Sequence, residues 1–397
     1  MKAPSGIAPS GGTNLDYARS FNRNVMIEAV RLKGPVSRAE LTRMTHLSAQ
    51  TVSNIVAELL NAGLLLEEGR RQAKRGQPAI DLVLNPDGAA TIGLTVEQRQ
   101  LTAILVNLVG ETRARRTLRL DRATPAEVLP KAAALVADLT AITGSTPLWG
   151  VGIAMPGPFA VDGADFSSPM TLPDWGGVDI IGAFTQLLDL PIELERDAAA
   201  AARAEYLYGA ARQMQQFFYL HFGVGLGGAY ARSGHPLRGM RGNAGEIGLI
   251  PARDGRPLED HVSRLALERA VAAAGADPAS LADPSAPATA AWIAGAVPEL
   301  RRAICILENL FDPQSIVLGG NLPPPVLSAL IAALHPLDPS IADTHDRRFP
   351  RVTAAALGPD GQAQGAAALP VFETLSPQPA SLRKSGSDDP GLPLSDR

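Results

Sequence analysis

The chain has 397 residues, of which 46% are hydrophobic and 19% charged, with a formal net charge of −4; this length allows two or three domains with cores of their own. No run of about 18 uncharged apolar residues is present, and the N-terminal sequence MKAPSGIAPSGGTN has no apolar signal core, so neither a membrane span nor secretion is expected. The single cysteine, Cys305, excludes an internal disulfide and a multi-cysteine zinc site, which favours a cytoplasmic protein.

Positive charge is concentrated near the N-terminus. Residues 1–90 contain 11 Lys or Arg and 8 Asp or Glu, a net charge of +3, which leaves −7 for the rest of the chain. This asymmetry is typical of a nucleic-acid-binding module joined to an acidic body.

Composition also divides the chain into segments. The two ends, 1–14 and 371–397, are rich in Gly, Pro and Ser and are expected to be disordered. Two folded domains are expected between them, over 15–86 and 87–370, joined at the turn sequence Asn85-Pro86-Asp87-Gly88.

The first domain has the sequence pattern of a winged helix-turn-helix. Ser37 and Glu40 form a capping box for one helix, and Ser48 is the N-cap of another. A basic loop separates two strand patterns that follow the helices. The predicted helices cover 24–32, 37–44 and 49–62, and the predicted strands cover 64–67 and 79–84.

Two groups of side chains in this domain suit DNA. The third helix begins with short polar groups that can bond base edges or phosphates in the major groove: Ser48, Gln50, Thr51, Ser53 and Asn54. The loop supplies cations for phosphates or a narrow minor groove: Arg70, Arg71, Lys74 and Arg75. A three-helix domain that only packs or dimerises, with a solvated charge run, is the other interpretation. Because both groups occur together, we expect binding to a double-stranded DNA operator.

The second domain alternates strand and helix patterns, which predicts an α/β body built from two similar lobes. Strands are predicted at 91–96, 101–108, 149–154, 192–195, 217–222, 228–231 and 315–318. Helices are predicted at 125–142, 180–188, 198–208, 258–273 and 299–310.

Seven segments of the chain, taken together and in order, resemble transcriptional regulators of the ROK family (repressors, open reading frames and kinases). They are Gly34-Pro35-Val36-Ser37-Arg38-Ala39-Glu40-Leu41, Leu47-Ser48-Ala49-Gln50-Thr51-Val52-Ser53, Gly152-Ile153-Ala154-Met155-Pro156-Gly157-Pro158, Leu172-Pro173-Asp174-Trp175, Glu195-Arg196-Asp197-Ala198, Gly242-Asn243-Ala244-Gly245-Glu246-Ile247-Gly248 and Ile316-Val317-Leu318-Gly319-Gly320. The similarity runs from about Asn22 to Leu369. It implies a two-lobed actin-like ATPase fold, of the ROK sugar-kinase type, with a sugar site between the lobes. Regulators of this family are homodimers or homotetramers.

The loop that holds ATP phosphates in the family's kinases is replaced in this chain. The family has Asp-x-Gly-Gly-Thr where this sequence has Thr95-Val96-Glu97-Gln98-Arg99. Without glycine, backbone N–H groups cannot approach a phosphate closely, and Glu97 adds a negative charge. We therefore expect no ATP cofactor and no kinase activity. The second glycine loop, Gly223 to Gly228, is interpreted as a tight hairpin turn.

The resemblance places several ligand-binding residues, and three of the family's polar residues differ here. The family's catalytic aspartate and two sugar-contacting glutamates correspond to Asp197, Glu246 and Glu259, and Gly157 and Asp174 lie in matching segments. Arg196 stands in place of an asparagine, Leu249 of a histidine and Met170 of an asparagine. Arg196 is predicted either to pair with Asp197 or to bind an anionic sugar derivative. The alternative is a pocket that serves only as scaffold.

No metal site is predicted. The family's structural zinc uses the histidine replaced by Leu249 and a cysteine cluster that is missing here. His221 and Cys305 are interpreted as core residues, and His261 as a candidate for reaching the pocket. The expected function is a repressor of carbohydrate-metabolism genes that senses a sugar or sugar derivative. A regulator whose body binds a partner protein, and an active sugar kinase, are the alternatives.

Overall fold

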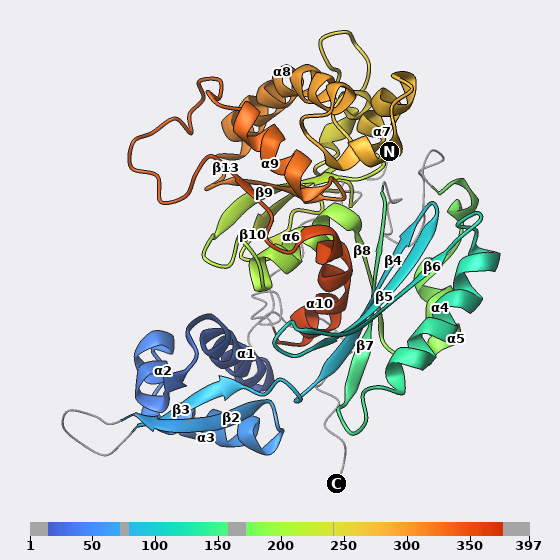
Figure 1. Cartoon of the computed structure of the whole chain (residues 1–397). Coiled ribbons are helices and arrows are strands. Elements are labelled where there is room, and N and C mark those ends of the chain that lie inside the picture. Colours follow the sequence, from blue (N-terminus) through green and yellow to red (C-terminus); the bar gives the residue numbers. More distant parts are fainter. Residues whose placement is uncertain (1–14, 72–78, 158–171, 241, 376–397) are drawn as a thin grey trace, which may run out of the picture.

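The computed structural model describes residues 15–71, 79–157, 172–240 and 242–375. An N-terminal unit of three helices and a small sheet lies at one end of a larger body that contains two five-stranded sheets (Figure 1). No helix of the described residues is long and apolar enough to cross a membrane.

The N-terminal unit is held together by caps and an apolar core. Ser37 and Glu40 form the predicted capping box, and the Ser48 hydroxyl accepts from the backbone N–H of Thr51 at 3.1 Å. The sheet has the order β1-β3-β2 and is antiparallel. Its elements are α1 (Leu15–Lys33), β1 (Val36–Ser37), α2 (Arg38–Thr45), α3 (Ala49–Asn61), β2 (Leu65–Arg71) and β3 (Ala79–Leu84).

The first helix is longer than the sequence pattern predicted. It was expected over 24–32, where apolar spacing is clear, yet it begins at Leu15. The added turns carry Arg19, Asn22 and Arg23, whose polar side chains hide the helical period from a hydrophobicity pattern.

The first lobe of the body is a mixed sheet with helices α4 and α5 on one face and α10 on the other (Figure 1). Its strand order is β6-β5-β4-β7-β8. The edge strand β6 was not predicted, because its eight residues are rich in arginine, partly exposed throughout, and lack a buried apolar face. The elements are β4 (Ala90–Glu97), β5 (Gln100–Asn107), β6 (Thr112–Arg119), α4 (Pro125–Thr140), β7 (Leu148–Met155), η1 (Pro173–Trp175), α5 (Ile180–Leu188) and β8 (Ile192–Arg196).

The second lobe repeats this plan with the strand order β11-β10-β9-β12-β13. The predicted helix over 258–273 is divided into a 3-10 turn and a helix, and the one over 299–310 is the second half of a 25-residue helix. Its elements are β9 (Gln216–Phe222), β10 (Leu226–Arg232), β11 (His235–Pro236), η2 (Ile247–Leu249), η3 (Leu258–Asp260), α7 (Arg264–Ala273), η4 (Pro278–Ala282), α8 (Pro287–Phe311), β12 (Ile316–Gly320), α9 (Pro324–Ala333), β13 (Val352–Ala354) and η5 (Gly358–Asp360).

Two helices rich in small residues, α6 (Asp197–Leu207) and α10 (Gly361–Leu375), cross between the sheets (Figure 1). A Cβ atom at Gly365 would collide with the backbone oxygen of Ala200, and one at Gly152 with that of Ala366. Glycine and alanine are therefore required because the backbones approach so closely. Every residue of α6 after Asp197 is buried.

The structure corrects the predicted start of the disordered tail. Residues 371–375 continue α10, with Phe372 and Leu375 only 3% and 5% exposed. The tail was predicted from its Gly, Pro and Ser content, and this composition did not show that its first five residues continue a helix. Leu375 packs in the core of the N-terminal unit together with Ala89, Leu108 and Trp149, so the two predicted domains share one apolar cluster.

Candidate functional site

The outer face of α3 carries an uncharged polar stripe. Ser48, Gln50, Ser53 and Asn54 are exposed, while the opposite face of the helix is buried in the core. The Gln50 amide donates to Asn54 Oδ1 at 2.9 Å. Thr51 is half-buried and its hydroxyl lies 2.8 Å from that of Ser48, so the stripe presents four of the five predicted polar residues fully to solvent.

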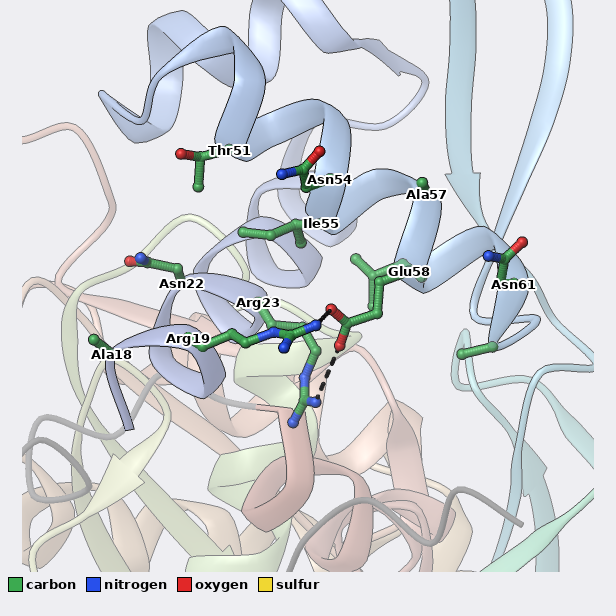
Figure 2. A pocket seen from close by; sticks show the side chains of 12 residues that line it. Ala18, Arg19, Asn22, Arg23, Thr51, Asn54, Ile55, Ala57, Glu58 and Asn61 are labelled. Carbon is green, nitrogen blue, oxygen red and sulfur yellow. Dashed lines mark hydrogen bonds and ion pairs between the residues drawn. The ribbon is translucent and has the colours of Figure 1, made fainter. Parts of the chain in front are cut away.

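The one acidic residue of α3 is paired with cations from α1. Glu58 contacts Arg19 at 2.8 Å and Arg23 at 3.6 Å across a groove of about 990 Å³ between the two helices (Figure 2). These guanidiniums offset a carboxylate that would otherwise repel the phosphates of a DNA backbone.

The predicted cations of the loop are only partly visible. The backbones of Arg70 and Arg71 form the last two positions of β2, but their side chains are not among those described. Lys74 and Arg75 lie outside the described residues. The two strands that flank the loop, β2 and β3, form an antiparallel hairpin.

A cavity of about 540 Å³ lies between the two lobes. Five of the predicted ligand-binding residues line it: Gly157, Arg196, Asp197, Glu246 and Glu259. The sixth, Asp174, does not, because it lies on η1 and pairs with Arg122 at 2.8 Å. His261 is also absent from the lining and contacts Asp254 at 3.1 Å instead.

Both terminal nitrogens of Arg196 contact the second lobe. One terminal nitrogen donates to Glu246 Oε1 at 2.7 Å and the other to the backbone oxygen of Ala244 at 2.5 Å. Its side chain is 3% exposed. The predicted pairing of Arg196 with Asp197 is therefore wrong, because its carboxylate partner is Glu246. The Nε atom of Arg196 is buried without a hydrogen-bond partner among the described residues.

Asp197 stands at the N-terminus of α6, where its carboxylate accepts from the backbone N–H of Ala198 at 2.6 Å. Burial raises the pKa of Asp197 to about 6, although the Ala198 N–H and the charge of Arg196 oppose that rise. Burial also raises the pKa of Glu246, against the influence of Arg196 and with that of Asp197. The charge of Asp197 therefore disfavours ionisation of Glu246 across the cavity.

The second glycine loop is occupied by a carboxylate. Glu259 accepts from the backbone N–H of Leu226 at 3.2 Å, and its oxygens lie where a Cβ atom at Gly225 would be. A Cβ at Gly248 would lie 2.9 Å from the same carboxylate. None of the loop's glycines has a positive φ. The loop is the tight turn of the β9–β10 hairpin, as predicted, because Phe222 pairs with Leu226 across it. Glycine is needed at position 225 for the close approach of Glu259.

The segment 95–99, which the sequence predicts to replace the family's phosphate loop, forms a contact between the lobes. Glu97, at the end of β4, accepts from the Asn321 side chain at 3.2 Å, while Arg99 points away and donates to the backbone oxygen of Asp121. His221 is 1% exposed and is bonded by the side chain of Gln362 from α10. Burial lowers the pKa of His221 to about 4 despite the nearby charge of Glu97, so its imidazole is neutral.

Helix α6 connects the cavity to the N-terminal unit. Its last residues meet Arg31 of α1, which donates to the backbone oxygen of Leu207 at 2.9 Å and stacks 5.3 Å from the ring centre of Tyr206. Glu28 pairs with Arg31 at 2.7 Å and accepts from the Tyr206 hydroxyl at 3.2 Å. We call Glu28, Arg31 and Tyr206 the α1–α6 clamp. No sequence pattern predicted it, because Tyr206 lies 175 residues or more from Arg31 and Glu28 and the three follow no motif.

Two further predictions concern Cys305 and metal ligands. Cys305 is half-buried on α8 with its sulfur 3.5 Å from the backbone oxygen of Pro339, so it is not a core residue as predicted. Within the described ranges no three His, Cys, Asp or Glu side chains are grouped as metal ligands.

A family model described as "ROK family" matches residues 91–371. The chain is 30% identical over 365 residues to the protein y4fQ of Sinorhizobium fredii, covering 90% of this chain and 92% of that one. It is 25% identical to the xylose repressor of Bacillus subtilis, over 58% of this chain and 60% of the repressor's length. It is 22% identical to the transcriptional dual regulator NagC of Escherichia coli, over 80% and 84% of the two chains.

Solved structures agree on the fold. A ROK family transcriptional regulator described as a homolog of the E. coli Mlc protein superposes with a TM-score of 0.70 at 22% identity, covering 91% of this chain and 98% of that one. A ROK family glucokinase from Streptomyces griseus superposes with a TM-score of 0.60 at 22% identity, covering 71% and 99%. The regulator's match extends over the N-terminal unit, whereas the kinase's covers a smaller share of the chain.

Proposed function

The chain belongs to the ROK family, and from this premise we propose that it is a DNA-binding transcriptional regulator, a repressor of carbohydrate-metabolism genes. In this proposal a sugar or sugar derivative binds between the lobes and controls DNA binding. The observation that carries the proposal is the direct link through α6, which runs from the cavity to the unit that bears the polar stripe of α3. Relatives named xylose repressor and NagC support it.

The N-terminal unit, over about 15–86, acts in this proposal as a winged helix-turn-helix. Helix α3 enters the major groove with Gln50, Ser53 and Asn54 towards the base edges. The loop between β2 and β3, with Arg70, Arg71, Lys74 and Arg75, contacts phosphates or the minor groove. A dimer or tetramer would present two such units to a palindromic operator.

The body, over about 87–375, acts as a sensor and not as a kinase. Phosphate binding would need free backbone N–H groups, and that of Leu226 is already bonded to Glu259. Glu97 adds a second carboxylate where the family's kinases have their first phosphate loop. We therefore expect millimolar ATP to leave the unfolding temperature unchanged.

The α1–α6 clamp supplies the physical route of control. Ligand contacts at Asp197 act on the N-terminus of α6, and the C-terminus of the same buried helix holds Arg31. A ligand shifts the orientation of the DNA-binding unit only if it binds the two arrangements with different affinity. A body that binds a partner protein in place of a sugar is the alternative, and the loss of the family's histidine at Leu249 is the observation that favours it.

The proposal is tested by measuring DNA and ligand binding on the same preparation. Duplexes selected from a random pool would define the operator, and thermal unfolding against neutral, amino, acidic and phosphorylated sugars would find the ligand. A ligand at about 100 times its Kd adds about 2.7 kcal/mol of stability, which shifts the midpoint visibly. A sugar that shifts the midpoint and changes operator affinity is the expected outcome. Operator binding that no sugar alters would favour the partner-protein alternative.

Asn54→Ala tests the DNA half separately. Loss of a side chain that reads a base edge should weaken the selected operator by about 1–3 kcal/mol and leave binding to unrelated duplex almost unchanged. Asn61→Ala is the matched control, since Asn61 is also exposed on α3 but lies at the far end of the helix. Equal losses for both variants, or for both kinds of DNA, would contradict the proposed orientation of α3.

A further inference from the structure

The cavity between the lobes has an excess of negative charge. Five carboxylates line it, against two guanidiniums: Glu97, Asp197, Glu246, Glu259 and Asp260, with Arg196 and Arg269. Both guanidiniums are already paired, Arg196 with Glu246 and Arg269 with Asp260. Glu97, Asp197 and Glu259 are left without an ion-pair partner among the described residues.

Two of these carboxylates converge on one stretch of backbone. Glu259 lies against Gly225, and Asp197 Oδ1 would be 3.6 Å from a Cβ atom at Gly227. Gly225 lies in the turn before β10, and Gly227 lies in β10 itself. Both carboxylates therefore lie against the β9–β10 glycine loop, on the wall of the same cavity.

An independent observation points to a polar ligand in the same cavity. His221 lines it and is 1% exposed, and its Nδ1 atom has no hydrogen-bond partner among the described residues. A buried ring nitrogen without a partner is costly unless a ligand completes its hydrogen bonds. Because the imidazole is neutral, it offers a hydrogen bond to a hydroxyl or amine without adding positive charge.

The carboxylates also disfavour each other's charge. Burial is the main cause of the raised pKa of Glu259, and the charge of Glu246 adds to it. Asp197 in turn contributes to the raised pKa of Glu246. A bound cation would offset both the cost of burying these negative charges and the repulsion between them. A neutral ligand would offset neither, and an anion would increase the repulsion.

We propose that the ligand of this cavity is a sugar bearing a protonated amine, and that the carboxylates of the cavity without an ion-pair partner hold its ammonium group. This inference rests on the proposed function, because it names the ligand class of the same site. The hydroxyl groups of such a sugar have His221 and Glu246 as neighbouring hydrogen-bond partners. Glu97 adds a further negative charge to the cavity wall, where it accepts a hydrogen bond from Asn321 of the second lobe.

The test is calorimetric titration of the full chain with three matched series at pH 7. Glucosamine, galactosamine and mannosamine carry the amine at defined positions, their N-acetyl forms are neutral, and glucuronate and glucose 6-phosphate are anionic. We expect at least one amine to bind roughly tenfold more tightly than its N-acetyl form and its parent hexose, as a charge-assisted hydrogen bond would give. That affinity should fall as the pH is lowered through about 6, where Asp197 becomes protonated, and as salt is added.

Glu259→Gln separates charge from shape. The variant keeps an amide oxygen for the Leu226 N–H, and it should reduce the preference for the amine over its parent hexose roughly tenfold. Glu268→Gln is the control, because Glu268 is a half-exposed α7 residue that pairs with Arg264 and does not line the cavity; it should leave the preference unchanged.

The outcomes distinguish this inference from the function on which it rests. Equal or tighter binding of a neutral or anionic sugar would overturn the ligand class and leave the sensor in place. If no sugar of any charge binds while operator binding persists, both the ligand class and the sensing half of the proposed function are wrong.

Discussion

At the scale of single residues, burial makes the ionised form of a carboxylate in the cavity energetically unfavourable. A carboxylate at a helix N-terminus is normally stabilised by the backbone N–H groups and the helix dipole. Asp197 has that position and one such hydrogen bond, yet burial outweighs both and raises its pKa. A binding site that carries such a cost in its empty state is expected where the ligand removes the cost.

Asp197→Asn should stabilise the unliganded fold at neutral pH. The folded-state pKa of Asp197, about 6, lies above its ordinary value of 3.8, so the ionised form destabilises the fold as the pH rises through 6. At 1.36 kcal/mol per pKa unit, removing the charge should add about 2–3 kcal/mol to the free energy of unfolding at pH 7.5. The gain should shrink as the pH falls towards 4, as measured by urea unfolding across that range. A gain that did not depend on pH would contradict the cause.

Glu246→Ala should have the opposite effect. It leaves the guanidinium of Arg196, which is 3% exposed at its side chain, without its carboxylate partner. Removing one member of a buried ion pair costs about 3 kcal/mol. The free energy of unfolding should fall by about that amount, while Glu268→Ala, which breaks a half-exposed pair with Arg264, should change it by less than about 1 kcal/mol. Equal effects of the two variants would show that Arg196 is solvated when unpaired.

At the scale of elements, α6 has two distinct ends. Its N-terminus bears Asp197 in the cavity, its C-terminus meets Arg31, and the alanine-rich segment between them is buried against α10. A short helix packed on all sides moves as a rigid body, because its neighbours leave no space for bending. Helix α6 thus links the cavity, to which it contributes Asp197, with α1 of the N-terminal unit.

Disrupting the α1–α6 clamp should uncouple ligand from DNA. Arg31→Ala removes the bond to the Leu207 oxygen, the pair with Glu28 and the stacking on Tyr206. The ratio of operator affinities with and without ligand, measured by fluorescence anisotropy, should fall towards 1 while ligand affinity stays within a few-fold. Tyr206→Phe, which loses only the hydroxyl bond to Glu28, should give a partial effect. Lys33→Ala, exposed on the same helix, is the control; an equal loss there would rule out the clamp as the route.

At the scale of the whole molecule, the N-terminal unit and the body do not have separate cores. Leu108, Trp149 and Leu375 of the body belong to the apolar cluster that contains Met26 and Leu59 of the unit. The Asn24 side chain also donates to the backbone oxygen of Thr374 at 3.2 Å. Shared burial of this kind makes the two parts unfold cooperatively.

Trp149→Ala should separate their unfolding. Trp149 is 9% exposed on β7, and truncating a buried tryptophan costs about 3–5 kcal/mol. Calorimetry should show one main transition for the natural chain and an additional early transition for the variant. Trp292→Ala, in the core of the second lobe and 7% exposed, should lower the main transition without dividing it. Two independent transitions in the natural chain would contradict the shared core.

The sequence by itself determined the elements with strong local signals. The capping box at Ser37, the N-cap at Ser48 and the apolar period of α3 depend only on neighbours in the chain, and each lies where it was predicted. The family motifs likewise identified Asp197, Glu246 and Glu259, which the fold brings to one cavity.

Only the tertiary structure decided what those residues contact. The partner of Arg196 is Glu246, 50 positions away, and the glycines at 225 and 248 are explained by a carboxylate that arrives from η3. The clamp at Arg31 and the burial of Leu375 also depend on chain segments that meet only after folding. Local patterns record backbone propensity and hydrophobic period, whereas ion pairs and close approaches depend on distances that no local pattern contains.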